Sequence, residues 1–212
     1  MSRSRERSDR RGFLSKLLVI GASSVALLSS SVYARGGQGG GGQSGGGQSG
    51  GGRGGQGGGR SRAALTQEQK DELFFIYQEE KVARDVYITL GKLYPNENTF
   101  ASIQLSEQRH IDAAQGLCEK YGIDISAVDE DQVGNFVLPV LQDLYDTCIG
   151  LGEESLPDAL RVGELVEVTD IKDLDHAIND LDMPDDVIRV YENLREGSYN
   201  HLEAFQSAIA RV

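Results

Sequence analysis

Six acidic and imidazole side chains fall on predicted helix faces that are otherwise apolar. They are Glu80, Glu107, His110, Glu164, Glu167 and His201. Burying several carboxylates without a countercharge is costly in free energy, or keeps the carboxyl groups protonated. Two divalent cations would neutralise four carboxylates, and carboxylate oxygen combined with imidazole nitrogen suits iron or manganese. The six residues therefore predict a buried site that holds a pair of metal ions.

The most informative single motif is the segment Glu-Gln-Arg-His at 107–110. Its first and last residues are three apart, so both side chains lie on one helix face, one turn from each other. Taken alone, a Glu on an apolar face usually snorkels or pairs with Arg, and a His is usually a hydrogen-bonded core residue. Few basic residues share these faces, Arg84 being the closest. The joint occurrence on several helices favours metal ligands.

Three other residues of ligand type lie on or near these helices. Glu79 adjoins Glu80, and Glu203 follows His201 by two positions, so both are fallback ligands. His176 lies off the apolar face of its helix, and we expect it at the surface.

Helical periodicity predicts that the elements positioning these residues are four long helices and one short helix. The long helices are expected at about 66–93, 99–122, 155–181 and 185–210, and the short one at 139–149. Thr66 with Gln69 is typical of a capping box, and Ser155 with Asp158 caps the third long helix. Gly122 is placed to end the second. Four long helices joined by loops suit an antiparallel bundle, so we expect an all-α domain over residues 64–212.

Two short segments resemble the ligand helices of rubrerythrins. Residues 80–87 (EKVARDVY) are similar to their first-helix pattern Glu-x-x-Ala-Arg-x-x-Tyr, and 163–167 (GELVE) to their third-helix pattern Gly-Glu-x-x-Glu. Over residues 65–212 the chain resembles the ferritin-like domain-of-unknown-function family 2202. The runs that carry this resemblance are 79–87, 106–110, 170–171 and 200–202. The resemblance implies a ferritin-like four-helix bundle, a fold whose di-iron members use Glu-x-x-His ligand pairs.

The last helix departs from that pattern, because Ser198 stands where the resemblance implies a bridging carboxylate three residues before His201. Either Glu164 supplies the fourth acid from another helix, or the site is asymmetric or holds a single metal.

The first 34 residues have the features of an export signal. Six basic and two acidic side chains accompany a short apolar run from Leu17 to about Leu28, and small residues precede the expected cleavage after Ala34. The run is shorter than the roughly 20 residues of a membrane span. Arg-Arg-x-Phe-Leu at 10–14 resembles the bacterial twin-arginine signal, although Asp9 and Ser15 depart from its usual flanks. An ordinary secretion signal or an uncleaved anchor is the alternative. We expect a periplasmic or otherwise exported protein.

Residues 35–63 are expected to form a disordered linker, because 17 of the 27 glycines lie between Gly36 and Gly59. From Leu65 onward the chain has 11 Lys and Arg against 31 Asp and Glu. Such an acidic domain should attract cations and should not bind nucleic acid or anionic lipid. We also expect no stable membrane insertion after signal cleavage.

The two cysteines, Cys118 and Cys148, fall among apolar neighbours and are either small buried residues or one disulfide. They cannot build the Cys₄ electron-transfer module of full rubrerythrins, so turnover would need an external electron donor. The motifs of serine hydrolases and phosphate-binding loops are absent from the sequence.

We therefore expect an exported ferritin-like protein with a di-iron or manganese site that acts on peroxide, oxygen or ferrous iron. The alternative is a metal-free helical bundle that serves as a tethered envelope binding or structural module. Sequence alone does not specify the oligomeric state.

Overall fold

The computed structural model describes residues 64–212, which contain five helices and no strand. The helices are α3 (Gln67–Leu93), α4 (Asn98–Lys120), α5 (Pro139–Gly152), α6 (Leu156–Asp180) and α7 (Asp185–Ile209). The prediction of an all-α domain is thus confirmed. The expected signal peptide, its cleavage after Ala34 and the Gly-rich linker lie outside the described residues.

The helix ends follow from local chemistry that the sequence displays. Thr66 and Gln69 form the expected capping box, and the Ser155 hydroxyl accepts a hydrogen bond from the backbone N–H of Asp158. Gly122 follows α4 with a φ of 66°, a left-handed conformation that favours glycine. The short helix α5 is longer than predicted. It runs through Gly150 to Gly152, since each helical glycine costs only about 1 kcal/mol.

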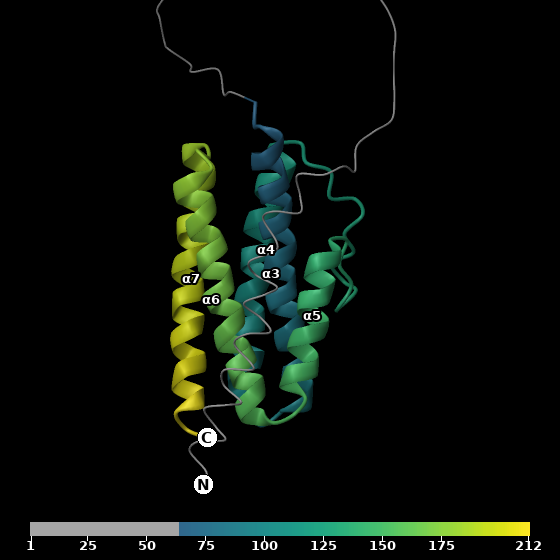
Figure 1. Cartoon of the computed structure of the whole chain (residues 1–212), viewed down its shortest axis with the longest axis vertical. Helices are drawn as coiled ribbons and strands as arrows, with labels where there is room; N and C mark the ends of the chain where they lie inside the picture. Colours follow the sequence, from purple (N-terminus) through teal and green to yellow (C-terminus); the bar gives the residue numbers. More distant parts are fainter. Residues whose placement is uncertain (1–63) are drawn as a thin grey trace, which may run out of the picture.

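The four long helices lie side by side with their axes nearly aligned, and α5 covers part of one flank (Figure 1). Helix α3 packs against α4, α5 and α6, while α7 packs against α6 and α4. Successive helices reverse direction, so the N-terminal end of α3 meets the loop between α6 and α7. There the Gln69 side-chain amide donates hydrogen bonds of 2.9 Å to the carbonyl oxygens of both Leu181 and Asp182.

An aromatic layer fills the core between α3, α4 and α7. The rings of Tyr87 and Phe205 lie 5.0 Å apart, and those of Phe100 and Phe205 lie 5.6 Å apart. Helix α6 closes on this layer at Gly163, where an added Cβ would stand 2.3 Å from a ring carbon of Phe205. The absence of a side chain at Gly163 is therefore what lets α6 approach α7 so closely.

A buried ionic network fastens the loop between α4 and α5 onto α3. Lys81 and Asp85 are fully buried and pair at 2.6 Å, and Arg84 pairs with Asp85 at 2.8 Å. Lys81 also donates to the carbonyl oxygen of Gln132 at 2.9 Å, and Arg84 donates to that of Glu130 at 2.6 Å. Both basic side chains therefore pair with Asp85 and donate hydrogen bonds to carbonyl oxygens of the loop.

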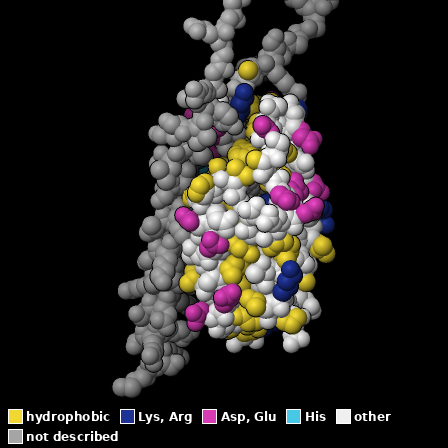
Figure 2. Space-filling view, turned by 90° about the vertical axis from the view of Figure 1, so that its right-hand side faces the viewer, with side chains coloured by type: hydrophobic (Ala, Val, Ile, Leu, Met, Phe, Trp, Pro, Cys, Tyr) yellow, Lys and Arg dark blue, Asp and Glu magenta, His cyan; other side chains and the backbone are white. Residues whose placement is uncertain are grey.

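Both cysteines are buried free thiols, in agreement with the first of the two expectations. Among residues 64–212, every helix is too short or too polar to cross a lipid bilayer. Asp and Glu side chains are spread over the face shown in Figure 2, and Lys and Arg are sparse there. The visible surface thus agrees with the acidic composition of the domain.

Candidate metal centre

Five of the six predicted site residues are buried close to one another between the four long helices. Glu80 comes from α3, Glu107 and His110 from α4, Glu167 from α6, and His201 from α7. The three acids are each 1% exposed, and the two imidazoles are 8% and 7% exposed. Each helix places its ligand-type residue on the face that otherwise forms the apolar core.

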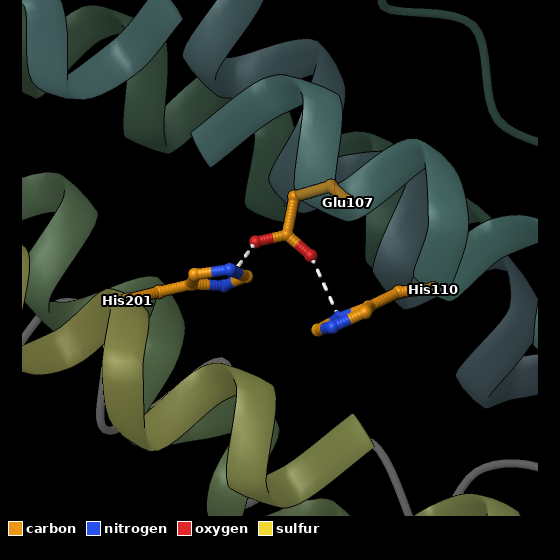
Figure 3. Close-up of side chains that lie close together, drawn as sticks. All are labelled: Glu107, His110 and His201. Atoms are coloured by element: carbon orange, nitrogen blue, oxygen red, sulfur yellow. Dashed lines mark ion pairs between the residues drawn. The ribbon is translucent and has the colours of Figure 1, made fainter. Parts of the chain in front are cut away.

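Glu107 stands between the two imidazole rings and directs one carboxylate oxygen at each (Figure 3). Its Oε2 atom lies 2.9 Å from Nδ1 of His110, and its Oε1 atom lies 2.7 Å from Nδ1 of His201. The rings are stacked with centroids 5.2 Å apart. Glu107, His110 and His201 each offer an atom within 4.8 Å of the other two, a spacing at which three ligands can share a metal ion.

A further carboxylate approaches each imidazole at Nδ1, the same ring nitrogen that faces Glu107. Oε2 of Glu80 lies 3.2 Å from Nδ1 of His110, and Oε2 of Glu167 lies 3.6 Å from Nδ1 of His201. Glu167 is oriented by Tyr87, whose hydroxyl donates to Oε1 at 2.6 Å. The arrangement is two half-sites, each with one imidazole and one outer carboxylate, joined by Glu107.

The short contact between His201 and Glu107 lacks the direction of a hydrogen bond. Although Nδ1 and Oε1 are 2.7 Å apart, both atoms are buried without a hydrogen-bond partner. Oε1 of Glu80 and Oδ1 of Asp170 are likewise buried without a partner. Several unsatisfied acceptors converging on one place are costly unless a cation or protons complete them, so this donor set fits a metal ion.

Asp170 is the site residue that the sequence analysis missed. It is 3% exposed, and the charges of Glu80, Glu167 and Glu107 all act on it. Its Oδ2 atom accepts a 2.6 Å hydrogen bond from the hydroxyl of Ser198. Asp170, on α6, thus places a carboxylate next to Ser198, the residue of α7 that stands where an acidic ligand was expected. The spacing Glu167-x-x-Asp170 was the available signal, because it repeats the i,i+3 relation of Glu107 and His110.

The structure does not bring Glu164 into this group, which corrects the expectation that Glu164 replaces the missing acid. Its side chain is half-buried and accepts a 3.2 Å hydrogen bond from Gln206 near the surface. Glu164 precedes Glu167 by almost one helical turn, and the site continues toward Asp170 instead. The fallback ligand Glu203 is exposed.

The remaining two residues differ from their expected places. Glu79 is buried, but it faces Asp173 on α6 rather than the two imidazoles. His176 is half-buried rather than a plain surface residue, and its Nδ1 atom lies 2.8 Å from Oδ2 of Asp180.

When no cation is bound, protons on the two imidazoles offset part of the negative charge of the carboxylates. Burial lowers the pKa of His110, but hydrogen bonds that its ring donates to the Glu107 and Glu80 carboxylates outweigh burial and raise that pKa to about 11. The pKa of His201 rises to about 9, because the nearby carboxylates of Glu107 and Glu167 outweigh the effect of burial. Burial raises the pKa of Glu107, yet the two imidazoles bring it down to about 2. Metal binding would have to displace the imidazole protons.

The pKa values of Glu167 and Asp170 are raised, which favours the neutral forms of both carboxyl groups. Burial, followed by the charge of Glu107, raises the pKa of Glu167 to about 8. Burial and the charges of Glu80 and Glu167 raise the pKa of Asp170 well above its usual range. Lys81 and Arg84 are engaged with Asp85 and the loop, so neither of these two supplies a countercharge. The centre therefore holds more carboxylates than the two imidazoles can neutralise.

The described domain also resembles proteins known by sequence or structure. Residues 69–211 match the family described as uncharacterized protein domain (DUF2202). The chain is 43% identical over 141 residues to the uncharacterized protein MJ0754 of Methanocaldococcus jannaschii, covering 66% of this chain and 75% of that protein. The crystal structure of hypothetical protein MJ0754 superposes with a TM-score of 0.67 at 39% identity, covering 71% of this chain and 84% of the other. The chain belongs to the DUF2202 family.

Proposed function

We propose that this protein is a ferritin-like metal-binding protein whose bundle holds two iron or manganese ions. The observation that carries the proposal is Glu107, whose two oxygens face the Nδ1 atoms of His110 and His201 at 2.9 and 2.7 Å. Glu80 would complete one half-site and Glu167 the other. Asp170 lies on the side of Ser198 and would supply a second shared carboxylate. This donor set of four carboxylates and two imidazoles suits iron or manganese.

Bound iron or manganese would supply one-electron chemistry toward peroxide, oxygen or ferrous iron. The chain's own residues bury the site, fix the carboxylates and retain a proton donor at Tyr87, whose hydroxyl touches Glu167. We further propose that turnover uses an external electron donor. We also propose that the N-terminal signal exports the protein and that residues 35–63 form a linker. The acidic surface favours cations over nucleic acid as partners.

The centre is tested by metal analysis of the purified protein before and after anaerobic loading with Fe(II) or Mn(II). We expect about two ions bound at the centre of each wild-type chain, from the number of half-sites. Glu107→Ala combined with His110→Ala should abolish binding at the centre. Glu203→Gln, which removes an exposed carboxylate, should leave it unchanged.

A metal-free bundle that serves as a binding or structural module is the competing function. It is favoured by the ability of protonated His110 and His201 to pair with Glu107. Less than about a tenth of an equivalent of metal after loading would decide for this function, because a preformed site of this ligand set should fill.

A further inference from the structure

The side chains of the centre differ in how far they reach solvent. The carboxylate side chains of Glu80, Glu107 and Glu167 are 1–2% exposed. The imidazole side chains of His110 and His201 are 10% and 9% exposed. These two rings come from α4 and α7 and lie between the two helices (Figure 3). Solvent therefore approaches the centre from the side of α4 and α7.

The opposite side of the bundle is covered by a further helix. Helix α5 packs against α3 and α6, the pair of helices across the bundle from α4 and α7 (Figure 1). The acids that α3 and α6 contribute are accordingly sealed, Asp170 being 3% exposed. Within residues 64–212, α5 is the one helix outside the set of four long helices. The line along which α4 and α7 meet, called the α4–α7 seam below, therefore has no such cover from this part of the chain.

The α4–α7 seam is fastened by polar contacts near both of its ends. Arg211 pairs with Glu97 at 3.6 Å near the start of α4. The hydroxyl of Tyr121, directly after α4, donates to Oδ1 of Asp186 on α7 at 2.9 Å. These contacts join the beginning of each helix to the end of the other, so α4 and α7 are antiparallel and the two imidazoles lie midway between the fastened ends.

Midway along the seam, Gly197 faces the imidazole of His110. An added Cβ at Gly197 would lie 2.4 Å from Nε2 of His110, so the edge of the ring occupies the space that a side chain would fill. Ser106 lies one turn before His110 on α4. Because the helices are antiparallel, Ser106 stands opposite His201, one turn after Gly197. Ser106 and Gly197 are both half-buried, and a solute that passes between them meets the imidazoles first.

We propose that the α4–α7 seam is the entrance through which divalent cations and solutes the size of peroxide reach the centre, with Ser106 and Gly197 at its rim. The seam combines the exposed edges of the two imidazoles, the missing side chain at Gly197 and the lack of a covering helix. This inference rests on the proposed function, because it names the route to the ions that the centre would bind.

The first test needs no metal. His201→Cys places a thiol in the centre, and its alkylation by iodoacetamide reports how fast a small solute arrives. Cys118 and Cys148 are fully buried and should stay unmodified, which peptide mass spectrometry verifies. Adding Ser106→Leu should slow alkylation of the introduced thiol by about tenfold, because moving an added side chain out of the way has a cost similar to core overpacking. Adding Ser126→Leu, at an exposed position of the loop between α4 and α5, should leave the rate unchanged.

The second test follows Mn(II) binding to the full chain without the introduced thiol, through the electron paramagnetic resonance signal of the free ion. Ser106→Leu should slow both the uptake of Mn(II) and its release to a chelator by about tenfold. Affinity and stoichiometry should not change, because a barrier on the route affects entry and exit alike. Ala113→Leu, at a half-buried position one turn after His110, should act in the same way. Ser126→Leu is again the control.

The proposal is overturned if neither Ser106→Leu nor Ala113→Leu slows alkylation while both variants retain the wild-type circular dichroism spectrum. It is also overturned if the affinity for Mn(II) falls while the alkylation rate is unchanged, because the substitution then acts on the ligands and not on entry. Slower alkylation in the variants, together with a wild-type chain that binds no Mn(II), would contradict the proposed function and support the seam as the route of small solutes.

Discussion

At the scale of single residues, the pair Ser198 and Asp170 decides how the centre is built. Ser198 lies three residues before His201, where it cannot act as a bridging carboxylate. Its hydroxyl instead donates to Asp170 at 2.6 Å and fixes a carboxylate that comes from α6. The acid near Ser198 thus comes from α6, and the charges of Glu80, Glu167 and Glu107 act on it. Ser198 has a positioning role in this arrangement.

Asp170→Asn should remove one of the negative charges that the two proposed metal ions would use. We expect a loss of affinity of at least about tenfold for one of them, in line with changes at ligand-supporting residues. Isothermal titration with Mn(II) under anaerobic conditions measures this. Ser198→Ala should give a smaller loss, since it frees the Asp170 carboxylate without removing it. Equal affinities for Asp170→Asn and wild type would show that Asp170 does not contribute to binding.

At the scale of elements, two glycines determine how closely the helices approach one another. Gly163 lets α6 lie against the ring of Phe205, and the same ring packs on Tyr87, which orients Glu167. Gly197 has a similar part on α7, because an added Cβ there would stand 2.4 Å from Nε2 of His110. The absence of side chains at these two positions therefore sets the dimensions of the centre.

Gly163→Ala should destabilise the fold by about 1–3 kcal/mol through overpacking, despite the higher helix propensity of alanine. Gly116→Ala is the matched control, since its Cβ would meet nothing within 4 Å on α4. That substitution should stabilise by roughly 0.5–1 kcal/mol. Urea unfolding of the metal-free protein measures both. The close approach at Gly163 would be unimportant if the two variants changed stability alike.

Lys81→Met should break the buried network that holds the loop between α4 and α5. It leaves Asp85 buried with fewer partners, and removing one member of a buried ion pair costs about 3–5 kcal/mol. Hydrogen exchange should show faster exchange in residues 129–137. Lys92→Met, on an exposed position of the same helix, should change stability by less than about 0.5 kcal/mol.

At the scale of the whole molecule, the described domain gathers its excess negative charge both outside and inside. The interior charge is the costly part, because burial raises the pKa of Glu80, Glu79, Glu167 and Asp170 above their ordinary values. The metal-free fold therefore retains protons that the unfolded chain releases as the pH passes the ordinary carboxyl pKa values.

This difference predicts that the metal-free protein becomes less stable as the pH rises from about 5 to 8. The folded state binds more protons than the unfolded state over this range, so the free energy of unfolding falls with rising pH. The raised pKa of His110 and of His201 acts in the same direction above about pH 6.5. Thermal unfolding in the presence of a chelator measures this dependence. An unfolding temperature that rises between pH 5 and 8 would contradict the buried, protonated acids.

Bound metal should reverse much of this dependence, because metal replaces protons in the centre. The same measurement after loading with Mn(II) should show an unfolding temperature that increases toward pH 8.

The sequence by itself determined the all-helical class and the helix caps, and it singled out five side chains that the fold buries together. Capping is a local interaction, and a Glu or His on an apolar face is visible as a break in helical periodicity. Only the tertiary structure decided between Glu164 and Asp170. Both precede or follow Glu167 by three residues, and the rotation and axial shift of α6 against α7 select which one turns inward. Likewise, its position next to Glu80 made Glu79 a fallback ligand, but in the fold Glu79 faces Asp173 on α6. Contacts between helices depend on the relative position of the helices rather than on local sequence.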